Sequence, residues 1–152
     1  MNLDRIEGTW YVIFTNFKMW LSGDKIRPTF TYMKEEKEGK FYLRDEVNYL
    51  HNGYIKSILG KDEPLDDENT KFRWQGNGLK SVFKSNWEII YFDEKLEWLI
   101  IYFDKSLLTA EGYDVLIKNK IPTEEQISAI KLKLTELNLA DELTSLLTSH
   151  QE

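Results

Sequence analysis

The stretch at residues 8–14 (GTWYVIF) decides how the rest of this chain is interpreted. Side chains alternate between the two faces of a strand, so Trp10 and Val12 share one face and Tyr11 and Ile13 share the other. Both faces are apolar, whereas a strand with one side in water would be polar on that side. We therefore expect a first strand that is covered on both sides.

The chain beyond this strand reads as further short strands separated by polar or glycine-containing turns. Together with the first, the expected strands are 9–14, 29–34, 40–50, 54–60, 70–75, 87–92, 97–103 and 113–120. Eight short strands joined mostly in order predict an all-β fold, an eight-stranded antiparallel up-and-down barrel. No linker or internal repeat interrupts the pattern, so we expect residues 1–152 to form a single domain.

An amphipathic C-terminal helix is predicted after the last strand. Thr123 and Gln126 have the spacing of a capping box, which marks a helix N-terminus. Apolar residues then recur at three- and four-residue spacing, at Ile127, Ile130, Leu134 and Leu137. This stripe predicts a helix over about 123–137 that packs outside the barrel.

The surface that this helix would cover is suggested by two strands with unusual composition. The segments 87–92 (WEIIYF) and 97–103 (EWLIIYF) are apolar on both faces, so their outer face needs a cover. We expect the helix stripe to lie against that hairpin. Residues 138–150 fit either a second helix or a short strand that returns to the barrel.

Charge and composition narrow the possible partners. The net charge of −6 argues against nucleic acid or an anionic membrane as a partner. No apolar run approaches the roughly 18 residues of a membrane span, so we expect no stable membrane insertion. The chain has no cysteine, which excludes disulfides, thiol nucleophiles and cysteine-ligated metals. We expect a monomer or a weak dimer.

The absence of cysteine also bears on the compartment. Because secreted barrels of this size often carry a disulfide, we expect a cytoplasmic protein. Only seven residues precede Gly8, too few for a signal peptide. A secreted or periplasmic location would follow if a leader has been removed.

Three parts of the chain resemble the lipocalins, a family of calycin barrels. Gly8 and Trp10 match the motif that opens the family's first strand. Asp93 ends an apolar strand, like the family's Asp in a turn at the closed end of the barrel. The stretch from Lys120 to Gln126 (KIPTEEQ) is similar to the last strand and helix entry of bacterial outer-membrane lipocalins.

The resemblance implies roles for these residues. In the family an Arg stacks across the first-strand Trp, and Lys120 stands at the matching position with a cation but without a planar guanidinium. Trp10 is therefore expected to lie buried at the closed end beside Asp93 and Lys120. The bacterial relatives carry an N-terminal lipoprotein cysteine that this chain lacks, so a membrane anchor is not implied.

The resemblance also implies binding and transport of a small hydrophobic molecule, such as a fatty acid or lysolipid, in the barrel lumen. By strand parity, the expected lining consists of Phe30, Tyr32, Phe41, Leu43, Val47, Tyr49, Phe72 and Trp74. The same residues would also make an ordinary core, so a ligand-free protein-interaction barrel is the alternative. A lumen of roughly 300 Å³ or more would favour the carrier.

The mouth of such a lumen is expected where four connections converge. These are 16–27, 51–53, 76–86 and 104–112, which strand order places away from Trp10. The first of them holds Met19, Trp20 and Leu21, which would be poor solvent residues. We expect Trp20 to act as a lid that touches ligand, in addition to anchoring its loop to the barrel.

The residues indicate no catalytic machinery, metal site or cofactor. The acidic segment 61–69 (KDEPLDDEN) lacks the ligand and glycine spacing of a calcium loop, so we expect an exposed turn. His51, at a predicted turn, is a poor haem ligand. An enzyme would need a polar lumen residue with a strongly shifted pKa, and Asp45 is the one candidate. Asp45 falls in the inward phase of its strand, so it is buried with a partner or sits at a bulge.

Overall fold

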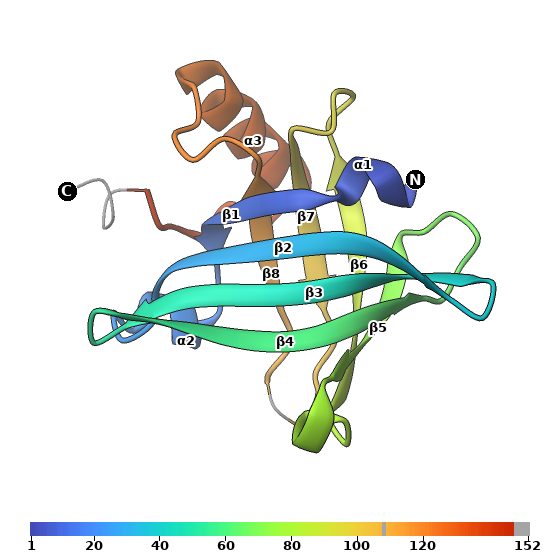
Figure 1. Ribbon diagram of the computed structural model, residues 1–152. Helices are drawn as coiled ribbons and strands as arrows, with labels where there is room; N and C mark the ends of the chain where they lie inside the picture. Colours follow the sequence, from blue (N-terminus) through green and yellow to red (C-terminus); the bar gives the residue numbers. More distant parts are fainter. Residues whose placement is uncertain (108, 148–152) are drawn as a thin grey trace.

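Antiparallel pairing of consecutive strands closes the sheet into a barrel (Figure 1). The computed structural model describes residues 1–107 and 109–147. Its barrel strands are β1 (Gly8–Thr15), β2 (Ile26–Lys37), β3 (Lys40–His51), β4 (Tyr54–Pro64), β5 (Lys71–Gly76), β6 (Lys84–Phe92), β7 (Trp98–Phe103) and β8 (Gly112–Ile117). Because β1 pairs with both β2 and β8, no barrel edge is left open, and the predicted eight-stranded up-and-down barrel is confirmed.

Short helices stand at both ends of the barrel. Helix α1 (Leu3–Ile6) precedes β1, and the indole Nε1 of Trp10 donates a 2.8 Å hydrogen bond to the Ile6 carbonyl. Helix α2 (Lys18–Leu21) follows β1, and the 3-10 helix η1 (Gly78–Lys80) follows β5. Figure 1 shows α1 at one end of the barrel and η1 at the other.

The long helix α3 (Glu124–Glu136) begins with the predicted capping box. The Thr123 hydroxyl accepts from the Gln126 backbone, and the Gln126 side chain accepts from the Thr123 backbone. These bonds satisfy two of the backbone donors that a helix N-terminus leaves free. The predicted helix over about 123–137, placed outside the barrel, is confirmed.

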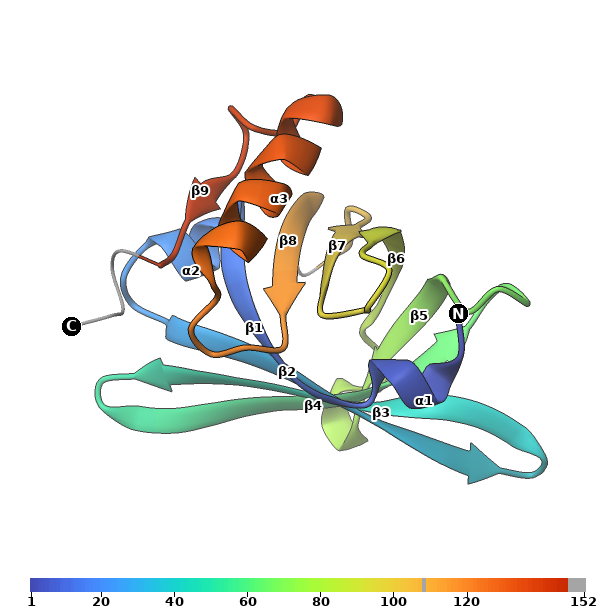
Figure 2. The same ribbon diagram turned by 90° about the horizontal axis from the view of Figure 1, so that it is seen from above.

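Helix α3 lies outside the barrel (Figure 2) and forms a second core there. Its buried residues Ile130 and Leu134 join outward-facing residues of three strands, namely Ile13 and Phe14 of β1, Trp98 and Ile100 of β7, and Val115 and Ile117 of β8. Strand β6 contributes Tyr91, which packs against this core with the Lys133 ammonium of α3 4.4 Å from its ring centre, whereas Ile90 and Phe92 stay partly exposed. The expected cover of the 87–103 hairpin is therefore correct for β7 and for Tyr91 of β6, and wrong for Ile90 and Phe92.

The segment after α3 returns to the barrel as a short strand. Strand β9 (Thr144–Ser145) pairs with Phe14 and Thr15 of β1, which decides between the two alternatives for this segment. Leu139 and Leu143 add to the core under α3. The last part of the predicted range, residues 148–150, lies outside the described residues.

The C-terminal end of β4 changes the interpretation of the acidic segment 61–69. Strand β4 continues to Pro64 because Lys61–Pro64 pairs with Phe72–Gln75 of β5. Asp62 is therefore fully buried inside the barrel, and the expectation of an exposed turn over all of 61–69 is wrong for this residue.

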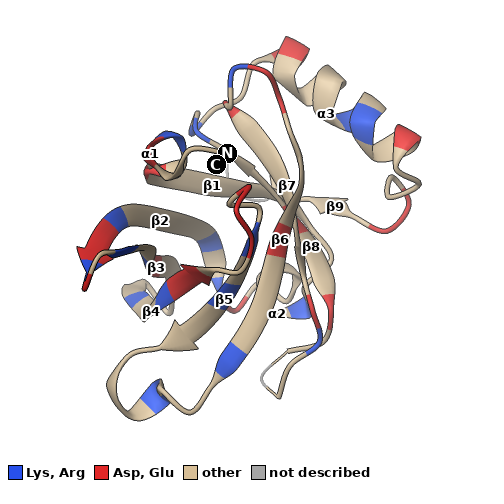
Figure 3. Ribbon diagram, turned by 90° about the vertical axis from the view of Figure 1, so that its right-hand side faces the viewer, with Lys and Arg blue, Asp and Glu red and all other residues tan. Residues whose placement is uncertain are grey.

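Acidic and basic segments are interspersed along the ribbon (Figure 3). Among the described residues, no helix has the length and apolar character needed to traverse a bilayer.

Candidate functional site

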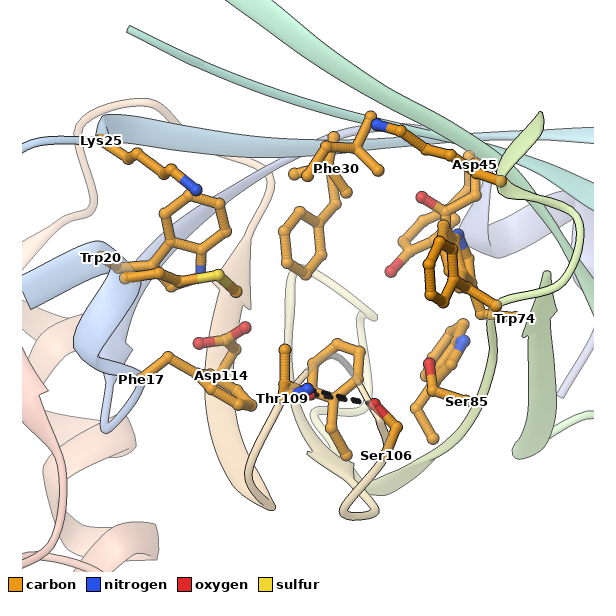
Figure 4. A pocket seen from close by; sticks show the side chains of 18 residues that line it. Phe17, Trp20, Lys25, Phe30, Asp45, Trp74, Ser85, Ser106, Thr109 and Asp114 are labelled. Atoms are coloured by element: carbon orange, nitrogen blue, oxygen red, sulfur yellow. Dashed lines mark hydrogen bonds between the residues drawn. The ribbon is translucent and has the colours of Figure 1, made fainter. Parts of the chain in front are cut away.

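The barrel lumen contains a cavity of about 330 Å³ at the end away from α1 (Figure 4). Its apolar and aromatic wall consists of Phe17, Met19, Trp20, Phe30, Val47, Ile58, Trp74, Phe83, Trp87 and Phe103. Its polar lining consists of Lys25, Tyr32, Asp45, Lys80, Ser85, Ser106, Thr109 and Asp114. A mainly apolar wall with a few polar groups is typical of a small-molecule site, and the volume lies at the lower end for such sites.

The structure brings five of the predicted lining residues into this wall: Trp20, Phe30, Tyr32, Val47 and Trp74. Two others, Leu43 and Phe72, are fully buried in the packed part of the lumen and do not reach the cavity. Tyr49 is half-buried behind the wall, with its ring centre 5.8 Å from that of Trp20. The packed part of the lumen explains why parity over-assigned the lining, since parity separates inside from outside but not cavity from core.

Phe41 is not in the lumen. It is 48% exposed because the β2–β3 hairpin extends beyond the barrel, where Phe41 pairs with Glu36. Its ring lies beneath the Lys34 ammonium, with Nζ 4.3 Å from the ring centre. The prediction of a lumen residue fails because the inward face of a strand ends where the barrel ends.

Three of the four connections expected at the mouth contribute to the cavity. Residues of 16–27, 76–86 and 104–112 line it. The turn 51–53 contributes none, although the imidazole Nδ1 of His51 lies 3.1 Å from the Asp24 carbonyl oxygen in the neighbouring loop. Trp20, on α2, is 2% exposed, so it is a buried wall residue of its loop.

Trp87 organises the inner wall. Its ring stacks on Phe72 at 4.5 Å between centres and on Tyr32 at 5.7 Å. Its Nε1 donates a 2.9 Å hydrogen bond to Oδ1 of Asp62. Parity could not single out Trp87, because both faces of its strand are apolar in sequence.

Two buried carboxyls from neighbouring strands form a pair at this wall. Asp45 on β3 and Asp62 on β4 are 5% and 0% exposed, and the two carboxyls lie close enough to shift each other's pKa. Burial raises the pKa of Asp45 to about 6 and holds the pKa of Asp62 well above its usual range. The nearby Asp45 charge raises the pKa of Asp62 further, so the pair holds a proton to a higher pH than two exposed carboxyls would. Asp45 is thus buried with a partner, one of its two expected environments.

A third buried carboxyl, Asp114 on β8, stands alone. It is fully buried, lines the cavity, and lies between Phe17 and Trp20 in Figure 4. Burial raises the pKa of Asp114 to about 7, although the nearby Thr15 hydroxyl and Trp20 indole lower it somewhat. Neither carboxyl oxygen of Asp114 makes a well-formed hydrogen bond within the described chain, and Trp20 Nε1 is also without one.

Asp62 and Asp114 were missed in the sequence reasoning. Asp114 lies two residues from Leu116 and therefore in the inward phase of its strand, the same signal that singled out Asp45. Asp62 gave no such signal, because it stands among other acids before Pro64 and its strand pairing is not local. Within the described ranges, no group of three or more His, Cys, Asp or Glu side chains could hold a metal ion.

The closed end is built around Trp10, which is fully buried. Asp93 lies in the β6–β7 turn, where its Oδ1 accepts from the backbone N–H groups of Glu97 and Trp98 at 2.7 and 3.0 Å. The cation over the Trp10 ring is Lys118, with Nζ 5.0 Å from the ring centre. The assignment of Lys120 to this position is wrong, because β8 ends at Ile117 and leaves Lys120 in solvent.

Comparisons with solved structures find the same barrel. The bovine lipocalin allergen Bos d 2 aligns with a TM-score of 0.64 over 100% of this chain and 99% of its own, at 14% identity. Lobster apocrustacyanin A1 aligns at 0.65 over 95% of this chain and 78% of its own, at 10% identity. This is the lipocalin fold.

A triple mutant of bovine odorant-binding protein has the lipocalin fold as well, with a TM-score of 0.57, 12% identity and 94% coverage of both chains. No family model matches the chain, and neither does any curated protein sequence. At these identities the likeness concerns the fold. The finer similarity to bacterial lipocalins stays a prediction.

Proposed function

We propose that this lipocalin-fold protein binds and carries a small hydrophobic molecule in its lumen. The observation that carries the proposal is the cavity of about 330 Å³, which exceeds the roughly 300 Å³ that separates a ligand site from a packed core. Its wall is formed by aromatic side chains from α2 and from strands on opposite sides of the barrel. A protein-interaction barrel would have no need of this space.

The proposed ligand class includes fatty acids, lysolipids and neutral apolar molecules, and the charges of the wall affect how each would lie. Lys25 and Lys80 are the lining cations, and both come from connections at the mouth. Asp45 and Asp114 are the buried lining acids. A fatty acid would therefore place its carboxylate at the mouth beside the lysines, with its chain inside.

The test is native mass spectrometry of the purified protein, followed by quenching of tryptophan fluorescence with a panel of fatty acids, lysophospholipids and long-chain alcohols. Trp20, Trp74 and Trp87 line the cavity, so a bound molecule changes their emission. We expect saturable quenching at micromolar concentration from at least one panel member. The absence of any bound mass and of any quenching would favour the interaction barrel.

A matched pair of variants connects binding to the lumen. Ser85 points into the cavity (Figure 4), so Ser85→Phe fills part of it and should weaken binding by roughly tenfold or more. Lys84→Phe adds the same ring at the exposed neighbouring position and should leave binding unchanged. Equal affinities of the two variants would place the ligand outside the lumen.

A second candidate function is acid–base catalysis in the lumen. Burial raises the pKa of Asp45 to about 6 and that of Asp114 to about 7, which are values suited to proton transfer near neutral pH. A carbonyl compound bound between these carboxyls could isomerise by a proton shift. Proton–deuterium exchange into a bound ketone, lost in Asp114→Asn, would support this function over simple carriage.

A further inference from the structure

The lumen presents a buried carboxyl that has no counter-ion among the residues that the structure describes. Asp114 is fully buried in the cavity wall, and none of the ion pairs formed within the described residues involves it. Both of its oxygens lack a well-formed hydrogen bond. A buried polar group without a hydrogen-bond or ion-pair partner lowers the stability of the fold. A packed core without a ligand would not be expected to keep such a group, so a partner for Asp114 in the cavity is expected.

Two hydrogen-bond donors beside Asp114 favour its ionised form and oppose the effect of burial. The Thr15 hydroxyl on β1 and the Trp20 indole on α2 are donors beside the carboxyl, and both lower its pKa. Within residues 1–107 and 109–147, the Trp20 N–H makes no well-formed hydrogen bond. A carboxylate with donors arranged beside it, but with no cation, is suited to a ligand that brings the positive charge.

Aromatic rings complete the environment of a cation at this position. Figure 4 shows Asp114 between Phe17 and Trp20, and both rings line the cavity. Aromatic faces attract an ammonium group, most strongly where water is excluded. Lys25 and Lys80 do not fill this role, since Lys25 lies over the Tyr49 ring, 5.3 Å from its centre, and Lys80 is exposed.

We propose that the lumen takes a small hydrophobic amine in its protonated form, with Asp114 as the counter-ion and the rings of Phe17 and Trp20 beside the ammonium. This proposal rests on ligand binding in the lumen and adds the chemical class of the ligand. The cavity accommodates an aromatic ring with a short aminoalkyl chain. A carboxylate ligand in the same orientation would meet Asp114 as a like charge.

Binding of such an amine displaces a proton from Asp114, so its affinity depends on pH. The residues that flank Asp114, which are Thr15 on β1, Ile101 on β7 and Trp20 on α2, do not titrate. The charged or titratable groups elsewhere on the cavity wall are Lys25, Tyr32, Asp45 and Lys80, with Asp62 behind Asp45. Since burial raises the pKa of Asp114 to about 7, the free carboxyl is mostly protonated at pH 6 and mostly ionised at pH 8.

The experiment uses three probes that share a phenyl ring and differ in charge: 2-phenylethylamine, 2-phenylethanol and phenylacetate. Calorimetric titration at pH 8 should show the amine binding roughly tenfold or more tightly than the alcohol, with phenylacetate weakest. The affinity of the amine should fall by up to about tenfold from pH 8 to pH 6, while that of the alcohol should not fall. At pH 6, titrations in two buffers of different ionisation enthalpy should show release of about one proton on amine binding.

Asp114→Asn keeps the shape of the side chain and removes its charge. In this variant the amine should lose its advantage over the alcohol and its pH dependence, while the alcohol still binds and reports an intact lumen. Glu88→Gln removes one charge from the outer half-buried position of β6 and serves as the control, with unchanged amine affinity. Asp45→Asn tests the other lining carboxyl.

The outcomes separate the two levels of the proposal. If the alcohol or phenylacetate binds as tightly as the amine, the amine proposal is overturned and carriage of a hydrophobic molecule stands. If Asp45→Asn rather than Asp114→Asn removes the advantage of the amine, the assignment of Asp114 is overturned. If none of the three probes binds and the lipid panel does not bind either, ligand carriage itself is overturned.

Discussion

The ammonium of Lys118 lies over the indole ring of Trp10, with Nζ 5.0 Å from the ring centre, and donates a 3.3 Å hydrogen bond to the Arg5 carbonyl. One side chain therefore connects the end of β8 to both α1 and β1. Trp10 completes this arrangement through its own hydrogen bond to the Ile6 carbonyl. The closed end of the barrel is held by residues from the two ends of the chain's barrel-forming part.

Trp10→Ala should be severely destabilising. Trp10 is fully buried, and removal of a large buried aromatic side chain costs about 3–5 kcal/mol in the free energy of unfolding. Trp10→Phe keeps most of the packing and loses the indole hydrogen bond, so its cost should be smaller. Urea unfolding followed by circular dichroism measures both. A Trp10→Ala protein with an unchanged midpoint would contradict the placement of β1.

Lys118→Met should reduce stability by about 0.5–1 kcal/mol, the range for a cation over an aromatic ring at an exposed site. Lys120→Met is the matched control and should change nothing measurable, because Lys120 lies in solvent beyond β8. Lys118→Arg should preserve or increase stability, since a planar guanidinium can stack on Trp10. Equal effects of the Met variants at 118 and 120 would argue against the assignment of Lys118.

Stability should fall as the pH rises from 5 to 8. Burial raises the pKa of Asp114 to about 7 and that of Asp45 to about 6, above the ordinary value of 3.8. At pH values between the ordinary pKa and the raised pKa of each carboxyl, the folded chain binds more protons than the unfolded chain. The free energy of unfolding therefore falls as the pH rises through this range. For Asp114 alone, the loss of stability between pH 5 and pH 8 is on the order of 2–3 kcal/mol.

Asp114→Asn provides the check on this pH dependence. The variant should be more stable than the parent at pH 8 and should have a flatter profile of unfolding free energy against pH. The pKa of Asp66 is lowered by hydrogen bonds from Thr70 and Lys71, so its contribution is constant over this range. Urea midpoints at half-unit pH steps measure the effect. A parent that gains stability towards pH 8 would contradict the burial of these carboxyls.

Leu134→Ala on α3 should destabilise the protein by about 2–4 kcal/mol, because Leu134 is 2% exposed in the core beneath the helix. Leu132→Ala, two residues away on the solvent face and 63% exposed, should change stability by less than about 0.5 kcal/mol. Thermal unfolding of the two variants measures the difference. Similar melting temperatures would mean that α3 does not pack on the barrel.

Local patterns in the sequence were enough to determine the architecture. The alternation in residues 8–14, the glycine-containing turns, and the capping box at Thr123 each report on neighbours within a few residues, and the barrel with its external helix follows from them. The strands that are apolar on both faces, 87–92 and 97–103, also indicated that a further element covers their outer face. These features are local, so a linear reading detects them.

The site depended on contacts between strands far apart in the chain. Strand parity placed Phe30, Tyr32 and Trp74 inside, but only the closed barrel shows which inward residues face a cavity and which, like Leu43 and Phe72, pack solidly. Parity also misplaced Phe41, because the length of the β2–β3 hairpin relative to the barrel is not a local property. The environments of the buried acids Asp62 and Asp114 likewise depend on contacts that are not local in sequence.

The inward phase of Asp114 in its strand could have singled it out. Its position beside Thr15 and Trp20, without a counter-ion in the described part of the chain, is visible only in the tertiary structure. Asp62 needed the pairing of β4 with β5 before its burial was visible. The cation at the closed end was decided by where β8 stops, which selects Lys118 over Lys120. The sequence thus determined the barrel through short-range pattern, and tertiary packing decided where its charges lie, because burial depends on neighbours from the whole chain.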